Sequence, residues 1–405
     1  MKLGKQEFIP SLSGFQFGYC MSIIAGALVY VAKAFSLKPT QEAFAASIAM
    51  LGAMCASVFA GTFANLIGRK QTLMLSIGMF LGGALLSAFA GDRATFFIGR
   101  FLVGIGGGIG TVVAPLYLVE IAAPDRRGAA ANLYQIGIAL GSLVAYLVAY
   151  FLSPSGNWRW MFALGAIPAI LQGVSLFFIP ESCQGEAQSA ASLARWKHLL
   201  NPAYRSRIYL ATSLSLVQAL SGASAIFYFA PRIFAKINFV GEKGPLIATL
   251  WIGAVYLLCT WLSFEVVDRW GRRFLLLASL MGMILSLGAV TLAYVIGASW
   301  LDWIFVSGLL LNIGSYAVGL GPVPPLVAGE ISPPEIRGHI MTIAGFAGWI
   351  GNYLVALTFL PLFNNLGLAG TFCLYIFFSI LGLGLLWKKL PETKQKSLEE
   401  IGTMF

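Results

Sequence analysis

Apolar stretches of about twenty residues recur along the whole sequence, separated by short polar segments. An α-helix rises about 1.5 Å per residue and needs about 20 residues to cross the hydrocarbon core of a bilayer. The pattern therefore predicts twelve membrane-spanning helices, near residues 9–32, 44–66, 71–90, 95–122, 129–152, 159–179, 206–231, 246–267, 274–297, 301–331, 338–362 and 368–390. We expect an all-α membrane protein.

The sequence also contains an internal duplication with an offset of roughly 210 positions. Three pairs of motifs occur in the same order in the two halves, each at the end of an apolar stretch: Asn65–Lys70 and Asp268–Arg273, Pro115–Gly128 and Pro325–Gly338, and Pro180–Ser182 and Pro391–Thr393. Self-similarity at one offset is typical of a repeated architecture. Because six spans return the chain to its starting side, the pattern predicts two parallel six-helix repeats.

Composition and charge agree with this prediction. Hydrophobic residues make up 58% of the chain and charged residues 10%, with a mean hydropathy of +0.82, whereas soluble domains carry about 25% charged residues. The net charge of +10 is spread over the segments between spans, as anionic lipids favour, and is not gathered into a nucleic-acid-binding surface. Most Lys and Arg residues lie on the side of the two termini, so both termini are expected in the cytoplasm. The expected location is a plasma or bacterial inner membrane.

The order of the spans predicts four segments. These are an N-terminal six-helix bundle (1–182), a cytoplasmic linker (183–205), a C-terminal six-helix bundle (206–390) and a cytoplasmic tail (391–405). Apolar residues at helical spacing lie among cations in residues 193–200, which indicates a short amphipathic helix at the membrane surface.

Catalytic and metal chemistry find little support in the sequence. The five cysteines show neither paired nor metal-ligand spacing, and His198 and His339 are both expected outside the bilayer. Carboxylates also lie at span ends or in loops, so no catalytic pair can be assembled at one depth. We expect no enzymatic activity, metal, cofactor or nucleic-acid partner, and we infer no obligatory protein partner.

A series of motifs resembles the sugar porter family of the major facilitator superfamily over essentially the whole chain. The matching pieces are Gly14–Tyr19, Gly61–Lys70, Gly99–Gly104, Pro115–Gly128, Pro180–Ser182, Gln218–Gly222, Asp268–Arg273, Gly321–Pro324, Glu330–Gly338 and Pro391–Lys394. The resemblance implies two six-helix bundles that expose one central site alternately to each side of the membrane, as parallel repeats allow. It also implies a small neutral solute, a sugar, as the substrate.

Charged residues at the cytoplasmic ends of the spans are expected to form a gate. Carboxylate and guanidinium groups there can pair in one conformation and separate in the other. The candidates are Arg69, Glu120, Arg127, Asp268, Arg269, Arg272, Arg273, Glu330 and Arg337. The alternative is that they are ordinary positive-inside residues. Asn65 stands where this family motif usually has an acidic residue.

The resemblance also assigns substrate contacts position by position. Gln135, Gln218, Trp349 and Asn352 match family positions that hydrogen-bond to the sugar or stack on it, and Ser224 and Tyr228 are further candidates. Polar amides inside apolar helices are unfavourable without partners, so binding is the first interpretation and hydrogen bonding between helices is the second. Amides both donate and accept hydrogen bonds, as sugar hydroxyls do.

Several positions depart from the family pattern. Ala219, Ser224, Tyr256, Pro325 and Gly348 stand where sugar porters usually carry polar or aromatic sugar contacts. A carrier of another small organic solute therefore stays open as an alternative, as does a nutrient receptor that binds without transport.

The tenth predicted span contains one glycine and three prolines within five residues: Gly321, Pro322, Pro324 and Pro325. Proline donates no backbone hydrogen bond and clashes with the preceding helical turn. Such a break inside a membrane is tolerated only beside protein neighbours or a cavity. A hinge is therefore predicted here.

Ion coupling is predicted from one position. In proton-linked sugar porters the residue after the Gly18-Tyr19 pair is an Asp that exchanges a proton near the Arg of span four; here it is Cys20, while Arg100 is retained. A buried thiol releases its proton far less readily than a carboxyl group. The expected function is passive uniport of a hexose or pentose by alternating access, with proton- or sodium-coupled symport as the alternative.

Overall fold

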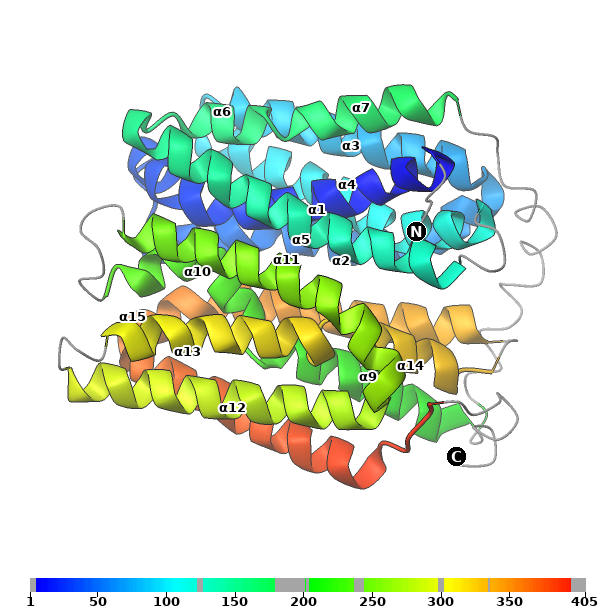
Figure 1. Cartoon of the computed structure of the whole chain (residues 1–405). Coiled ribbons are helices and arrows are strands. Elements are labelled where there is room, and N and C mark those ends of the chain that lie inside the picture. The colour runs from blue at the N-terminus through cyan, green and yellow to red at the C-terminus, as the bar shows by residue number, and fades with distance from the viewer. Residues whose placement is uncertain are drawn as a thin grey trace. The chain divides into compact units, whose positions relative to one another are not determined.

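The computed structural model describes residues 5–121, 127–178, 201, 204–236, 244–297, 302–333 and 336–394, and the regular structure in these ranges is helical. The chain divides into two compact units, Met1–Leu193 and Ala194–Phe405. Each unit is a bundle of long helices (Figure 1). The amphipathic helix predicted for the linker lies outside the described residues.

The first unit contains six membrane-length spans. They are α1 (Lys5–Ala34), α2 (Pro39–Leu66), α3 (Arg69–Ala88), α4 (Arg93–Ile121), α5 (Arg127–Leu152, followed by the short helix Ser153–Ser155), and the pair α6 (Trp158–Ala163) and α7 (Ala166–Leu176), which together make one span.

The second unit repeats this arrangement with more interruptions. Its elements are α9 (Arg205–Leu220), α10 (Ala223–Phe234), α11 (Gly244–Trp270), α12 (Arg272–Ile296), α13 (Asp302–Ser315), the π-helix η6 (Tyr316–Leu320), α14 (Val323–Ile331) and α15 (Arg337–Lys389). The pair α9 and α10 makes one span, and α13, η6 and α14 make another.

Helix α15 consists of two spans. Gly367 inside it has φ 70° and ψ 179°, a conformation that breaks the helix and that only glycine adopts without strain. Eleven helical segments of the described chain are long and apolar enough to cross a membrane, and the division of α15 brings the number of spans to twelve. The predicted all-helical, twelve-span fold is confirmed.

Close contacts between helices hold the first unit together. Helix α1 packs along α5, and α4 packs between α2 and α3. A Cβ atom at Gly104 of α4 would overlap the backbone carbonyl of Ala49 in α2, and one at Gly18 of α1 would overlap that of Ile138 in α5. Small residues therefore let these backbones approach closely, as is usual inside membranes.

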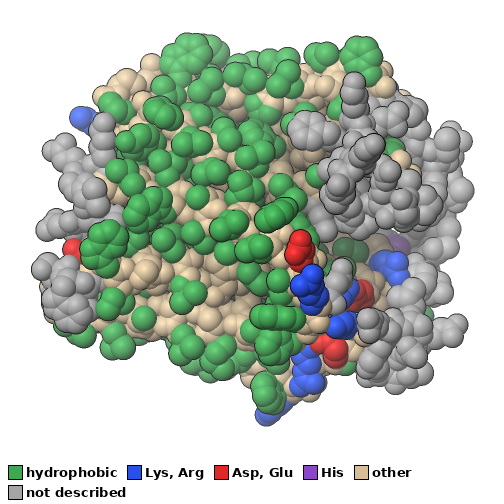
Figure 2. Space-filling view, in the orientation of Figure 1, with side chains coloured by type: hydrophobic (Ala, Val, Ile, Leu, Met, Phe, Trp, Pro, Cys, Tyr) green, Lys and Arg blue, Asp and Glu red, His purple; other side chains and the backbone are tan. Residues whose placement is uncertain are grey.

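The exposed surface of both units is largely apolar. Phe59, Phe178, Leu285 and Trp387 are more than half exposed. Figure 2 shows hydrophobic side chains spread over the visible face, whereas the visible charged side chains gather mainly at one end of the second unit. A surface of this kind fits contact with lipid rather than water.

Candidate functional site

The first unit contains one predicted carboxylate–guanidinium pair. Arg69 begins α3 directly after Gly68, whose φ of 92° turns the chain sharply into the helix. The Nε atom of Arg69 lies 3.3 Å from Oε1 of Glu120, near the end of α4. Its Nη1 atom donates to Oδ1 of Asn65 at 2.6 Å. The Asn65 amide oxygen thus accepts one hydrogen bond of the guanidinium, at the position where the family motif usually has an acidic residue.

The second unit contains the equivalent pair. Gly271, with φ 84° and ψ 163°, precedes Arg272 at the start of α12, almost the same conformation as at Gly68. Both Nε and Nη2 of Arg272 lie 3.1 Å from Oε1 of Glu330, in the last turn of α14. The duplication seen in the sequence therefore recurs as one geometry in each unit.

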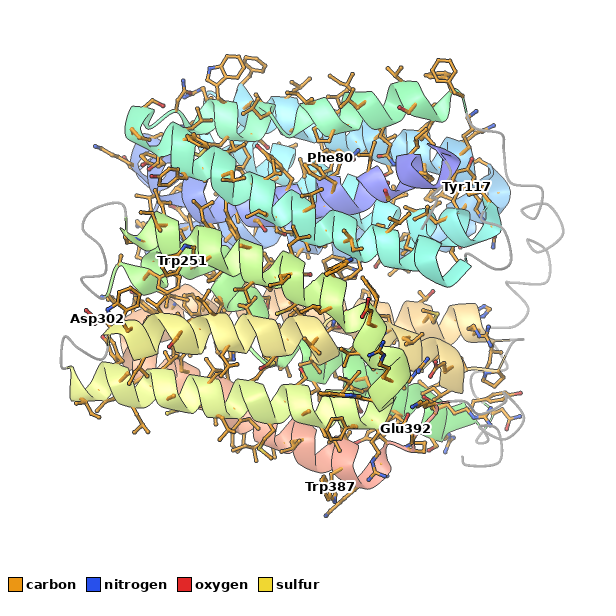
Figure 3. All side chains as sticks on the ribbon, in the orientation of Figure 1. Phe80, Tyr117, Trp251, Asp302, Trp387 and Glu392 are labelled. Carbon is orange, nitrogen blue, oxygen red and sulfur yellow. The ribbon has the colours of Figure 1, made fainter. Side chains whose placement is uncertain are left out.

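The segment after α15 reinforces the pair in the second unit. Thr393 donates its hydroxyl to Oε2 of Glu330 at 2.6 Å. The carboxylate of Glu392 accepts the backbone N–H groups of Arg272 at 2.9 Å and Arg273 at 3.0 Å, which are free donors at the start of α12. It also accepts the N–H groups of Thr393 and Lys394. Figure 3 shows Glu392 at this end of the unit.

These contacts set the ionisation of Glu392. Partial burial alone would raise the pKa of its carboxyl group, but the hydrogen bonds from four backbone N–H groups outweigh burial and hold the pKa below its ordinary value. The carboxylate is therefore charged at neutral pH and acts as a cap for α12.

The other predicted gate residues have different surroundings. Arg273 donates Nη2 to the carbonyl of Trp387 at 2.7 Å, and Arg337 donates Nε to the carbonyl of Ser332 at 3.4 Å. The Arg269 side chain is exposed, although its carbonyl accepts a hydrogen bond from Nζ of Lys394. The side chains of Arg127 and Asp268 lie outside the described residues.

The predicted hinge lies directly after a widened helical turn. The N–H of Gly321 donates to the carbonyl of Tyr316 at 2.7 Å, the i to i+5 spacing of a π-helix. Gly321 and Pro322, which lie between η6 and α14, keep right-handed helical angles. Pro322, Pro324 and Pro325 supply no N–H to the helical ladder.

A serine of α12 is inserted into this widened turn. The Ser279 hydroxyl donates to the carbonyl of Ser315 at 2.7 Å and accepts the N–H of Leu320 at 3.0 Å. It therefore bridges a donor and an acceptor that stand five residues apart and satisfies both. Sequence reasoning did not identify Ser279, because a serine in an apolar helix usually bonds to its own helix.

Gln218 approaches the same turn from α9. Its Nε2 atom donates to the carbonyl of Gly321 at 2.9 Å, and its side chain is also hydrogen-bonded to the hydroxyl of Tyr316. The ring of Tyr316 packs edge-on against Phe227 of α10 at 6.0 Å between centroids. Tyr316 is a second residue that sequence reasoning missed.

The remaining predicted substrate residues are partly or fully buried. In the second unit, Ser224 is the second residue of α10, and its buried hydroxyl has no hydrogen-bond partner within the described ranges. Tyr228 is buried on the same helix, and Asn352 in α15 donates to the carbonyl of Gly348 at 3.0 Å beside half-buried Trp349. The half-buried residue Gln135 belongs to α5 of the first unit.

The coupling position brings together the two residues that the sequence singled out. Arg100 of α4 is 1% exposed and Cys20 of α1 is 3% exposed. The guanidinium donates through Nη1 and Nη2 to the backbone carbonyl of Cys20, each at 3.3 Å, and Nη1 also lies 3.3 Å from its sulfur atom. The Phe162 ring lies 5.5 Å from the guanidinium carbon, a cation–π contact.

No carboxylate of the described chain pairs with Arg100. Its Nε atom is buried without an acceptor there. The side chain also lines a cavity of about 10 Å³, room for about one water molecule, together with Tyr19, Phe80 and Phe162. Figure 3 labels Phe80 within the first unit.

A buried polar network links α1 to α7 in the first unit. Gln16 donates to Oε1 of Gln172 at 2.6 Å, and Gln172 donates to the hydroxyl of Ser13 at 2.7 Å. All three side chains are at most 5% exposed. Amide side chains in apolar spans were the sequence signal for this network. Here these amides join neighbouring helices of one bundle.

Comparison with known proteins identifies the family. The family described as "Sugar (and other) transporter" matches residues 7–195 and 183–405 of this sequence. The chain belongs to this family. The predicted membership among the sugar porters of the major facilitator superfamily is therefore confirmed, and with it the assignment as a multi-pass membrane protein.

Individual relatives align over almost the whole chain. The galactose-proton symporter of Escherichia coli K12 is 31% identical over 428 residues, covering 97% of this chain and 92% of that protein. The arabinose-proton symporter of the same strain is 30% identical over 430 residues, covering 96% and 91%. The solved inward-open xylose transporter of Escherichia coli matches with a TM-score of 0.85 at 26% identity, covering 98% of this chain and 99% of that chain.

Proposed function

We propose that this protein carries a monosaccharide, a hexose or a pentose, across the cell membrane by alternating access and passive uniport. The sugars in the names of its relatives, galactose, arabinose and xylose, support the substrate class. The observation that carries uniport is that the buried Arg100 contacts Cys20 and no described carboxylate. Proton-linked members have an Asp at this position.

The contact between Arg100 and Cys20 bears on proton coupling. A proton carrier must bind and release a proton at accessible pH, and a carboxyl group beside a guanidinium can do so. The Cys20 thiol is buried and is a much poorer proton donor than a carboxyl group. The pair therefore lacks a carboxyl group that could take up and release a proton during transport.

The substrate contacts and the gate complete the proposal. Gln135, Gln218, Ser224, Tyr228, Trp349 and Asn352 are proposed to contact the sugar. Among these, the Ser224 hydroxyl has no hydrogen-bond partner in the described chain, so a sugar hydroxyl would satisfy it. We propose that both termini lie in the cytoplasm, and that the pairs Arg69–Glu120 and Arg272–Glu330 separate when the cytoplasmic side opens.

The four predicted segments are retained in this proposal. They are bundles at 1–182 and 206–390, a linker at 183–205 and a tail at 391–405. The relatives named above are transporters, and we assign this chain no enzymatic activity, cofactor, nucleic-acid partner or obligatory protein partner.

Purified protein in liposomes tests the proposal. Exchange of labelled for unlabelled sugar is measured at equal pH, and net uptake is measured with and without an inward proton gradient. Exchange without gradient-driven accumulation is expected. Cys20→Asp should gain accumulation because it restores a titratable carboxyl group beside Arg100, and Cys20→Ser, which adds no such group, should not.

Two other outcomes support other functions. Accumulation by the natural sequence under the gradient contradicts uniport and supports proton symport, the activity named for its galactose and arabinose relatives. Absence of exchange with every hexose and pentose contradicts sugar transport. It favours another small organic solute, which the departures at Ala219, Ser224, Pro325 and Gly348 would accommodate.

A further inference from the structure

Pro325 leaves one backbone carbonyl of the tenth span without its usual donor. In an α-helix the carbonyl of residue i accepts the N–H of residue i+4, so Gly321 would bond to residue 325. Proline has no N–H. The Gly321 carbonyl instead accepts a hydrogen bond from Nε2 of Gln218 at 2.9 Å. A side chain of α9 therefore supplies the donor that Pro325 lacks.

The same amide reaches the other end of the widened turn. Gln218 is hydrogen-bonded to Tyr316, the first residue of η6, as well as to Gly321, the residue after its end. Ser279 of α12 also bonds within this turn, to the carbonyl of Ser315 and the N–H of Leu320. The turn is thus held by α12 through a hydroxyl and by α9 through an amide.

The amide has limited capacity. A glutamine side chain offers two N–H donors and one carbonyl acceptor. Gln218 uses one N–H donor for the Gly321 carbonyl, and its hydrogen bond with Tyr316 uses another hydrogen-bonding group of the amide. A substrate that recruits the whole amide must therefore displace a protein partner and leave a buried carbonyl unpaired, which is unfavourable.

We propose that Pro325 is a specificity-determining residue that acts through Gln218. Because Pro325 has no N–H, the Gly321 carbonyl accepts a hydrogen bond from the Gln218 amide instead. Sugar hydroxyls then compete with this carbonyl for the amide. A sugar that takes over the Gln218 amide breaks the contact between α9 and the start of α14. Recognition at Gln218 and loosening of the tenth span are then one event. This inference rests on the proposed sugar transport.

A thermal-stability cycle tests the first half without any transport assay. Gln218→Leu, Pro325→Ala and the double variant are compared with the natural sequence by their unfolding midpoints in detergent. Gln218→Leu should lower the midpoint in the natural sequence, because it leaves the Gly321 carbonyl unpaired. It should lower the midpoint much less in the Pro325→Ala background, where residue 325 donates its N–H to that carbonyl. Additive effects of the two substitutions would overturn the proposal.

Sugar affinity tests the second half. Pro325→Ala should lower the half-saturating concentration for sugar exchange by about three- to tenfold, the equivalent of one hydrogen bond released for binding. Pro324→Ala is the matched control, since it restores an N–H to the carbonyl of Leu320 and not to that of Gly321. Equal affinity gains in both variants would overturn the proposal, because hinge flexibility alone would then explain them.

The two measurements separate this inference from the proposed function. If the protein exchanges no sugar, the proposed function fails, and the stability cycle still decides whether Pro325 and Gln218 are coupled. If sugars are exchanged but the cycle is additive, sugar transport stands and the inference fails.

Discussion

Gly271 and Glu392 are in such close contact that a Cβ atom at residue 271 would lie 2.7 Å from Oε2 of Glu392. The two residues are far apart in sequence, yet the carboxylate sits over the first N–H groups of α12. A side chain at 271 would have to move a carboxylate that four backbone N–H groups hold in place.

Gly271→Ala should therefore destabilise the second unit more than a positive φ alone explains. Alanine at φ 84° and ψ 163°, a region that essentially only glycine occupies, costs about 1–3 kcal/mol in backbone strain. Disturbing the Glu392 cap should add about 1 kcal/mol. Gly367→Ala is the matched control, because Gly367 has a similar backbone conformation, φ 70° and ψ 179°, and open space around its Cβ position. Equal losses of unfolding free energy in the two variants would show that the Glu392 contact contributes nothing.

Stability should depend on acid pH through Glu392. Because its pKa is lowered in the folded protein, the contribution is present above the ordinary glutamate pKa of about 4.3 and is lost as pH falls through the lowered value. The unfolding midpoint of the natural sequence should thus fall more steeply below about pH 4.3 than that of Glu392→Gln. Parallel pH profiles for the two proteins would contradict this assignment.

Asn65→Asp should strengthen the pair in the first unit. The amide oxygen of Asn65 already accepts Nη1 of Arg69 at 2.6 Å, and a carboxylate in its place makes a charge-assisted bond, about twice as strong. We expect a higher unfolding midpoint and slower sugar exchange, because the gate must separate during transport. Asn65→Ala should have the opposite effect on the midpoint. Faster exchange in Asn65→Asp would argue against Arg69 and Glu120 as part of a gate.

Ser279→Ala should disturb the widened turn. It leaves the Ser315 carbonyl and the Leu320 N–H without their partner, at a cost of about 1–3 kcal/mol. Exchange should lose maximal rate more than affinity, since Ser279 holds the hinge and is not proposed to touch sugar. Ser263→Ala is the control, because the buried Ser263 hydroxyl donates only within its own helix, to Thr260. A change in affinity alone would place Ser279 at the substrate instead.

Hydropathy predicted the spans well because the bilayer requires one apolar helix length each time the chain crosses. Even the division between the last two spans, predicted at residues 362–368, coincides with the break at Gly367. The Arg272–Glu330 pair was also predictable, because both halves carry an arginine and a glutamate at equivalent span ends, Arg69 with Glu120 and Arg272 with Glu330. The roles proposed for these residues stay predictions.

The contacts around the tenth span were not predictable from residue types. Ser279 resembles the other serines of apolar helices, and only the packing of α12 against η6 shows that it bridges Ser315 and Leu320. The three prolines predicted a break, but not that it would take the form of a π-helix with Gln218 as a substitute donor. Hydrogen bonds between spans depend on helix rotation, which hydropathy leaves open.

The position of Glu392 in the chain has a consequence for biogenesis. Three further spans are synthesised after α12 before the residue that caps it emerges from the ribosome. Helix α12 must therefore enter the bilayer with its first N–H groups uncapped. The hydrogen bonds from the start of α12 to Glu392 can therefore form only after the last span has been synthesised.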